Sequence, residues 1–340
     1  MEYTKNNPSN IFLPNQETFR KAKDLFLSWE ILSFPTETVY GLWANALDEK
    51  AIQKIFKLKN RPQDNPIISH VARKEQISEY AYITNYIEQT IIDKLMPWPI
   101  TILLPPKNMV PASITAWHPL MSIRIPSHPV ALDLLSLCDF PIAAPSANIS
   151  TKPSPTSAQM VYDNFWEDVP MIIDWWNCLV WIESTVVRVD GNQITITRPW
   201  YITKEDLEAL FEYKVEVVYW QKPSAVTPWN KYKHYSPDAI VSIFSTIDEL
   251  LEKINSSNSA SIWIIATKEF LDQHRDEISL ANISIFELWT ESNILSCAHN
   301  LFSIYHSCDK IWIKEVFIKS LPENWVWYAL MNRIKKSSNF

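Results

Sequence analysis

The stretch Ser33-Phe-Pro-Thr-Glu-Thr-Val-Tyr-Gly41 decides the fold class, because a buried strand ends there in a row of polar side chains. The apolar residues 31–34 predict a short buried strand that ends at the proline. A hydroxyl, a carboxylate and a second hydroxyl follow at Thr36, Glu37 and Thr38. Ligand sites of α/β proteins form at such strand ends. The same residues also fit a capped turn in which the two threonines satisfy backbone groups.

Helices and strands alternate on both sides of this stretch. Amphipathic helices are predicted at residues 16–29 and 48–58, and Asp48 is a suitable N-cap for the second. The pattern continues with helices at 77–96, 130–138, 157–165 and 204–211, and with strands at 65–71, 100–104, 121–125, 142–144, 171–174, 184–189 and 193–197. The last two strands are predicted to form a hairpin at Asp190-Gly191. The sequence therefore predicts an α/β structure with a mixed sheet.

A composition change near residue 215 indicates a second domain. Residues 215–233 contain two prolines with serines and threonines and show no sustained periodicity. The pattern then resumes with strands at 239–244, 261–266, 283–288 and 310–313, and with helices at 247–254, 270–278, 294–306 and 328–336. Such alternation predicts a small parallel sheet. We therefore divide the chain into a first domain at 1–214, a linker at 215–237 and a second domain at 238–340.

Composition excludes several classes of protein. The formal net charge of −7 and the pI of about 5.6 argue against binding to nucleic acid through bulk charge, although a local basic pocket is compatible with them. No apolar run reaches the length of about 18 residues that a membrane span needs, and the first residues lack a signal-peptide core. The four cysteines are scattered, and the histidines lack metal-ligand spacing. We expect a cytoplasmic protein with reduced thiols and no protein-held metal.

Two further clusters could bind an anion. Residues 57–66 place Lys57, Lys59 and Arg61 at a predicted helix end, which fits either a solvated C-terminal cap or a polyphosphate clamp. Residues 143–156 contain small residues, hydroxyls and an amide after a buried strand. They fit a donor-rich loop for an anion or a nucleotide, and equally an ordinary polar loop before a helix.

Taken together, these segments resemble a known family. The motifs follow one another as Phe34-Pro-Thr-Glu-Thr-Val-Tyr-Gly-Leu42, Lys59-Asn-Arg-Pro-x-x-Asn-Pro66, Arg124-Ile-Pro-Ser-His-Pro129, Pro141-Ile-Ala-Ala-Pro-Ser-Ala-Asn148, Glu183-Ser-Thr-Val186 and Arg198-Pro199. In this order they resemble the YrdC-like threonylcarbamoyl-AMP synthases. The segments at 230–237 and 329–333 resemble the long form of that family. The resemblance implies a YrdC-like catalytic domain with a twisted mixed sheet and a smaller Rossmann-like domain with a parallel sheet.

The resemblance also implies a reaction. L-threonine, bicarbonate or CO2, and ATP give threonylcarbamoyl-AMP and pyrophosphate, so the enzyme is a nucleotidyltransferase. Mg²⁺ would be carried by the triphosphate. The product would pass to a downstream complex that modifies transfer RNA to threonylcarbamoyladenosine, and weak binding of RNA by the chain itself is compatible with this role. The alternative is a non-catalytic RNA-binding or regulatory protein of the same fold.

Site residues are carried over only where motifs match. The nucleotide-binding set of the family, with its catalytic role, falls on Lys59, Arg61, Ser146 and Asn148. Further ATP-contacting positions fall on Asn65, Ser154, Arg198 and Tyr235, and threonine-contacting positions on Thr38, His70, Arg124, Ala144 and Ser184. Arg124 is the natural partner for the substrate carboxylate. Tyr235 lies in the linker, which folds over the active site in the family, so we expect the linker to act as a lid. A plain tether with a packed aromatic residue is the alternative.

The glycine and tryptophan contents are abnormal. The chain has 2 glycines and 16 tryptophans, whereas average usage would give roughly 24 glycines. Tryptophan stands where the family pattern has glycine at Trp43, Trp98, Trp175, Trp176, Trp181, Trp200 and Trp229, and Trp117, Trp325 and Trp327 occupy glycine-like places. The codon UGA is read as tryptophan in one variant code and as glycine in certain bacterial lineages. We therefore predict that most of these residues are glycine in the native protein.

This hypothesis makes a structural prediction. If Trp43, Trp175, Trp176 and Trp200 stand in place of glycine, they should protrude, crowd the cleft or have strained backbone. If they are genuine, they should be packed and unstrained, with partnered indole N–H groups.

Overall fold

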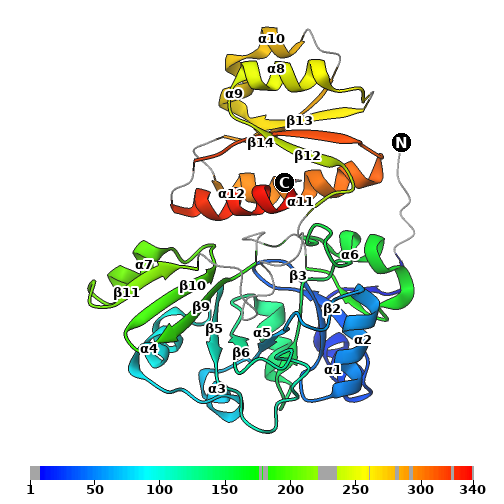
Figure 1. Cartoon of the computed structure of the whole chain (residues 1–340). Coiled ribbons are helices and arrows are strands. Elements are labelled where there is room, and N and C mark those ends of the chain that lie inside the picture. Colours follow the sequence, from blue (N-terminus) through cyan, green and yellow to red (C-terminus); the bar gives the residue numbers. More distant parts are fainter. Residues whose placement is uncertain are drawn as a thin grey trace. The chain divides into compact units, whose positions relative to one another are not determined.

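The computed structural model forms two compact units, and it describes residues 8–175, 178, 183–220, 236–259, 261–279, 283–290, 294–322 and 325–338. The first unit comprises Met1–Ser150, Ser154–Leu179 and Glu183–Lys231, and the second comprises Thr151–Pro153, Val180–Ile182 and Tyr232–Phe340. Each unit has helices packed on a sheet, which confirms the predicted α/β class (Figure 1). Within the described ranges, no helix combines the length and apolar character that crossing a bilayer requires.

A mixed sheet organises the first unit. Its strands are β1 (Ile11–Phe12), β2 (Leu32–Pro35), β3 (Tyr40–Asn45), β4 (Ile68–His70), β5 (Ile100–Leu104), β6 (Met121–Arg124), β7 (Ile142–Ala143), β8 (Ile172–Ile173), β9 (Thr185–Asp190), β10 (Gln193–Arg198) and β11 (Glu216–Tyr219). Their spatial order is β1-β8-β2-β3-β7-β4-β6-β5-β9-β10-β11. β9 and β10 form the predicted hairpin, where Gly191 has a φ of +58°. The order places the ends of β4, β6, β5 and β9 next to one another.

Helices cover this sheet. They are α1 (Gln16–Leu27), α2 (Glu49–Lys59), α3 (Lys74–Tyr80), α4 (Tyr86–Leu95), α5 (Pro129–Ser136), α6 (Ala158–Phe165) and α7 (Lys204–Leu210), and the 3-10 turn Trp166–Asp168 follows α6. Asp48 caps α2 as predicted, because its side chain accepts from the N–H groups of Lys50 and Ala51. The helix expected at 77–96 is split, since the N–H of Tyr82 donates to Pro105 O at 2.8 Å.

Two clusters of buried apolar side chains fix the strands of the first unit. One joins α1 and α5 to β2 and includes Phe19, Phe34 and Leu134. The other joins α4 to β5 and includes Ile91 and Ile102. Because both clusters are fully buried, the polar strand ends are held on rigid elements.

The second unit is a parallel sheet, as predicted. Its strands are β12 (Ile240–Phe244), β13 (Ile262–Thr267), β14 (Ser284–Trp289) and β15 (Glu315–Lys319), in the order β12-β15-β13-β14. Its helices are α8 (Ile247–Ser256), α9 (Lys268–Gln273), α10 (Arg275–Ser279), α11 (Ile294–Lys310) and α12 (Trp325–Ser337). The strand expected at 310–313 is displaced to β15, because α11 continues to Lys310.

Three strands of the first unit, β1, β3 and β11, differ from the sequence-based expectation, and no strand was predicted at β1. β3 was not predicted, although it pairs antiparallel with β2 through Leu42 and Ser33. β11 lies inside the range 215–237 that was expected to be a linker, and it pairs in parallel with β10. The first unit therefore extends at least to Tyr219, because the alternating apolar residues of β11 complete the sheet.

Candidate active site

The turn between β2 and β3 presents the polar residues of the stretch at 33–41. Thr36, Glu37 and Thr38 are all buried, with exposed fractions of 3%, 2% and 1%. The hydroxyls of Thr36 and Thr38 lie 2.7 Å apart, and the hydroxyl of Thr36 donates to Val39 O at 3.0 Å. The capped turn is thus confirmed for Thr36, whose hydroxyl also accepts from the N–H groups of Thr38 and Val39, while Glu37 and Thr38 contact another element.

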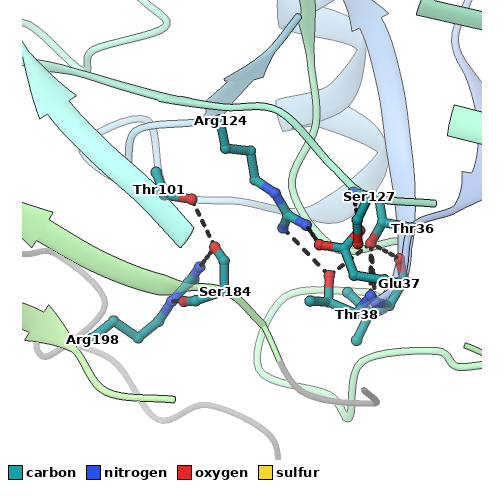
Figure 2. A network of polar contacts seen from close by, with 9 residues as sticks. Thr36, Glu37, Thr38, Thr101, Arg124, Ser127, Ser184 and Arg198 are labelled. Atoms are coloured by element: carbon teal, nitrogen blue, oxygen red, sulfur yellow. Dashed lines mark hydrogen bonds and ion pairs between the residues drawn. The ribbon is translucent and has the colours of Figure 1, made fainter. Parts of the chain in front are cut away.

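That element is the end of β6. The guanidinium of Arg124 makes a buried ion pair with the carboxylate of Glu37, and its Nη1 lies 3.4 Å from the hydroxyl of Thr38 (Figure 2). The second oxygen of Glu37 accepts from the N–H of Ser127 at 3.1 Å. Nε of Arg124 is buried and has no hydrogen-bond partner in the part of the chain that the structure describes. Burial lowers the pKa of Arg124, and the charge of Glu37 acts in the opposite direction.

His70 lies beside Arg124. The two residues are paired in the parallel register of β4 and β6. Burial lowers the pKa of His70 well below 6.5, and the charge of Arg124 lowers it further, so the imidazole is neutral near pH 7. Its Nδ1 has no hydrogen-bond partner among the described residues. Ala144, also expected near threonine, is buried at the end of β7 and donates its N–H to Ile68 O at 2.9 Å.

A second polar group follows on the next strands. The antiparallel pairing of Ile102 with Ile123 places Thr101 beside Arg124. The hydroxyl of Thr101 lies 2.7 Å from that of Ser184, which accepts from Nη2 of Arg198 at 2.9 Å (Figure 2). Thr38, His70, Arg124, Ala144 and Ser184 thus lie on the strands of one sheet or directly beside their ends.

The Lys59 region differs from its sequence-based description. We expected Lys59 at an exposed helix end, but its side chain is only 1% exposed. Its Nζ donates to the backbone oxygen of Ser146 at 2.5 Å and to that of Asn148, so the lysine holds the loop after β7. Burial lowers the pKa of Lys59 well below its ordinary value, and the charge of Arg61 lowers it further.

The other expected ATP contacts surround this loop. Arg61 donates from Nη2 to Pro66 O at 2.8 Å and from Nε to Asn65 O at 3.1 Å. Among the described residues, Oδ1 of Asn65 is buried without a hydrogen-bond partner, and the hydroxyl of Ser146 lies 2.5 Å from Oδ1 of Asn148. The set therefore gathers two basic side chains around a polar loop, which suits an anionic ligand.

Sequence reasoning missed two carboxylates. Glu37 was noted only as part of its stretch, and Glu183 only as part of a motif. Glu183 accepts from the hydroxyl of Ser154 at 2.6 Å, and both residues are buried. A carboxylate between two threonines, followed later by an arginine at a strand end, was the available signal for Glu37. Tyr235 and the lid expected around it lie outside the described residues.

The tryptophans near the site divide into two kinds. Trp43 contradicts the expectation for a glycine position and fits the alternative, because it is fully buried, stacks on Phe34 at 4.0 Å and donates its indole N–H to Phe34 O at 2.9 Å. It also packs against His70, with ring centroids 4.5 Å apart. Trp175 protrudes, at 42% exposure, and Trp200 is buried with an indole N–H that has no partner among the described residues, so these two agree better with the glycine hypothesis. Trp176, Trp181 and Trp229 lie outside the described residues.

Comparison with known proteins agrees with this geometry. A family model described as "Telomere recombination" matches residues 27–199, and one described as "Threonylcarbamoyl-AMP synthase, C-terminal domain" matches residues 202–339. The threonylcarbamoyl-AMP synthase of Pyrococcus abyssi is 33% identical over 332 residues, with 94% of each chain covered. The chain belongs to the threonylcarbamoyl-AMP synthase family. It is the long form of that family, a group of nucleotidyltransferase enzymes.

Other relatives give the same result. The threonylcarbamoyl-AMP synthase of Bacillus subtilis is 30% identical, with 95% of this chain and 94% of the relative covered. The crystal structure of P. abyssi Sua5 complexed with L-threonine matches with a TM-score of 0.84 and 31% identity, over 97% of this chain and 96% of that one. The predicted family and fold are therefore confirmed along nearly the whole chain.

Proposed function

We propose that the strand ends of the first unit catalyse formation of threonylcarbamoyl-AMP from L-threonine, bicarbonate or CO2, and ATP. The amine of threonine forms a bond to the carbon of CO2 and loses a proton, which gives a carbamate. A carbamate oxygen then attacks the α-phosphorus, and the bond to pyrophosphate breaks. Positioning and electrostatic stabilisation dominate such a step. The observation that carries the proposal is the buried cluster of Arg124, Glu37 and Thr38, which β5 links to Ser184 and Arg198.

The threonine subsite would form around Arg124. The guanidinium offers a fork to the substrate carboxylate, and its unpartnered Nε shows that it has donor capacity left. Glu37 would face the ammonium group of the substrate. Zwitterionic threonine carries one charge for each partner of the buried ion pair, its carboxylate for Arg124 and its ammonium group for Glu37. Thr38, Ala144 and Ser184 would supply the walls, with His70 as a neutral hydrogen-bonding group.

The ATP subsite would form around the loop that Lys59 holds. Arg61, Asn65, Ser146 and Asn148 would face the phosphates or the nucleoside. Ser154, Arg198 and, from the linker, Tyr235 complete the proposed set. Mg²⁺ would enter with the triphosphate, whose oxygens are the ligands it prefers. Among the described residues no group of three His, Cys, Asp or Glu side chains could hold a metal, so the phosphates would be its main ligands.

The product would serve a downstream reaction. An acyl-adenylate is a mixed anhydride, so its threonylcarbamoyl group would be transferred to a nucleophile by a separate complex, here to an adenosine of transfer RNA. The acidic net charge suits an enzyme for small substrates better than one held on RNA. We place the reaction in the cytoplasm, a proposal that the four buried free cysteines support.

Pyrophosphate release tests the proposal. The chain should release pyrophosphate from ATP only when L-threonine and bicarbonate are both present, because the attacking oxygen belongs to their joint product. D-threonine serves as a matched control, since it carries the same groups in the wrong arrangement around Arg124. Pyrophosphate release at the same rate with and without threonine would contradict the proposal. No release under any condition would favour the non-catalytic alternative.

A further inference from the structure

Tryptophan is frequent among the residues whose backbone has a positive φ, the left-handed conformation. Nine residues other than glycine have a positive φ in the described part, and four of them are tryptophan: Trp29 (64°), Trp117 (60°), Trp166 (50°) and Trp312 (60°). Tryptophan makes up only 16 of the 340 residues. A positive φ occurs in a few per cent of residues with a side chain and is an outlier for bulky ones. Tryptophan is thus concentrated where glycine is favoured.

The end of α1 shows the reason most clearly. The N–H of Trp29 donates to Phe26 O at 3.3 Å, and the N–H of Glu30 donates to Leu25 O at 2.9 Å. These two bonds define a Schellman motif, whose left-handed residue is usually glycine because a Cβ is disfavoured there. Trp29 occupies that residue.

The end of α11, in the other unit, repeats the arrangement. The N–H of Trp312 donates to Asp309 O at 3.4 Å, and the N–H of Ile313 donates to Cys308 O at 3.1 Å. Trp312 again occupies the left-handed residue of a Schellman motif. Two helices in separate parts of the fold therefore end in the same way and with the same unsuitable residue.

Trp166 ends a third helix by a different turn. It is the C-cap of α6, with φ of 50° and ψ of −124°. These angles match the first central residue of a type II′ turn, a position dominated by glycine. Trp117 follows Ala116, which also has a positive φ, and donates its N–H to Ala112 O at 2.9 Å.

Packing does not explain these four positions. Their side chains are 49%, 66%, 67% and 77% exposed for Trp29, Trp117, Trp166 and Trp312. Nζ of Lys50 lies 4.3 Å from the ring centroid of Trp29, and the ring centroids of Tyr162 and Trp166 lie 5.9 Å apart. Contacts of this kind on an exposed surface are weak beside the cost of a left-handed bulky residue. An exposed indole thus gains little here, whereas glycine would relieve the strain.

We propose that Trp29, Trp117, Trp166 and Trp312 are glycines in the protein that the organism makes, because UGA codons read there as glycine have been translated as tryptophan. The family pattern did not identify Trp29, Trp166 and Trp312 as glycine positions. Their positive φ values therefore extend the inference to residues that the sequence did not indicate. Replacing all 16 tryptophans would give 18 glycines, close to the roughly 24 expected for this length. The inference implies a glycine-charged tRNA that reads UGA in the host cell.

Peptide mass spectrometry of the protein from its host cells tests the identity of the residues. The tryptic peptide that spans residues 24–50 contains positions 29 and 43, and the peptide 311–314 contains position 312. Fragment ions should show the residue mass of glycine at positions 29 and 312. Tyr213 is a matched control, because it also has a positive φ of 59° and is 75% exposed, yet it should remain tyrosine. Tryptophan masses at 29 and 312 would overturn the proposal.

Thermal unfolding of the recombinant full chain tests the physical reason. Trp29→Gly and Trp312→Gly should each raise Tm by about 2–4 °C, because each removes the strain of one left-handed residue. Tyr213→Gly should give a gain of similar size and so calibrates that strain. A fall in Tm for both tryptophan variants beside a rise for Tyr213→Gly would contradict the proposal, since it would show that the indoles stabilise their positions.

Discussion

The guanidinium of Arg124 and the carboxylate of Glu37 form an ion pair in which both side chains are almost fully buried, at 4% and 3% exposure. Glu37 comes from the turn after β2 and Arg124 from the end of β6, so the pair joins two parts of the sheet. Removing two charges from water is costly, and only their mutual contact and hydrogen bonds offset that cost. Each residue therefore holds the other in place.

The first prediction concerns the stability of this pair. Glu37→Ala should lower the free energy of unfolding by about 3–5 kcal/mol, because it leaves the Arg124 charge buried without a partner. Urea unfolding followed by circular dichroism measures the change. Lys21→Ala is a control, since it breaks the exposed pair of Lys21 with Glu17 and should cost about 0–1 kcal/mol. Equal effects of the two variants would contradict the assignment.

The second prediction concerns substrate binding. Arg124→Lys keeps the charge but loses the planar fork, so the KM for L-threonine should rise about tenfold to a hundredfold, from a loss of about 1.5–3 kcal/mol in charged hydrogen bonding. The KM for ATP should change little. Pyrophosphate release over a threonine titration measures both effects. An equal rise in both KM values would show that Arg124 does not belong to the threonine subsite.

The third prediction separates Lys59 from Arg61. Because Lys59 is buried and holds the backbone of Ser146 and Asn148, Lys59→Ala should lose both activity and stability. Arg61→Ala should keep the fold and lose about 10²–10³ in rate, as expected when a transition-state contact is removed. Turnover and Tm measured on both variants distinguish the two roles. Full activity of Arg61→Ala would remove it from the proposed site.

The fourth prediction concerns acid stability. Burial lowers the pKa of His128 to about 4, from 6.5 in the unfolded chain. Between these values the unfolded state binds more protons, so stability is lost as the pH falls from 6.5 towards 4, by about 3 kcal/mol in total. His128→Gln should remove this part of the pH dependence of the free energy of unfolding. Urea midpoints at pH 7, 5 and 4 measure it, and an unchanged slope in the variant would contradict the assignment.

The fifth prediction concerns the proposed lid. Truncation at about Val226 removes Tyr235 and should leave a folded first unit with weaker use of ATP. Tyr235→Ala in the full chain should likewise raise the KM for ATP, and Tyr235→Phe should separate the hydroxyl from the ring. Identical ATP kinetics in all these proteins would make the linker a tether.

Much of the fold could be predicted from local pattern. The hairpin at Gly191 and the Asp48 cap depend on a few neighbouring residues, and both are confirmed. β3 was missed because its residues from Tyr40 to Asn45 are buried on both faces of the sheet. Such a strand lacks the alternation of apolar and polar side chains that identifies a half-buried strand. β15 was misplaced because the end of α11 cannot be located from apolar spacing alone.

The closeness of some expected site residues could be predicted, but most of their contacts could not. The family resemblance assigned Arg124 and Thr38 to one subsite, and in the structure Nη1 of Arg124 lies 3.4 Å from the hydroxyl of Thr38. The burial of Lys59 was not predictable, because a lysine at a helix end is ordinarily solvated, whereas here its side chain donates to the loop after β7. The pairing of Glu37 with Arg124 joins residues that are 87 positions apart in the chain, which no local pattern specifies.

Carbon transfer from bicarbonate tests the central claim most directly. The full chain should be prepared both as printed and with glycine at the 16 tryptophan positions, then incubated with ATP, L-threonine and ¹³C-labelled bicarbonate. Mass spectrometry should detect threonylcarbamoyl-AMP with one ¹³C atom, formed in equal amount to pyrophosphate and lost when threonine is omitted. A folded glycine form that yields only unlabelled AMP, or no adenylate at all, would contradict the account.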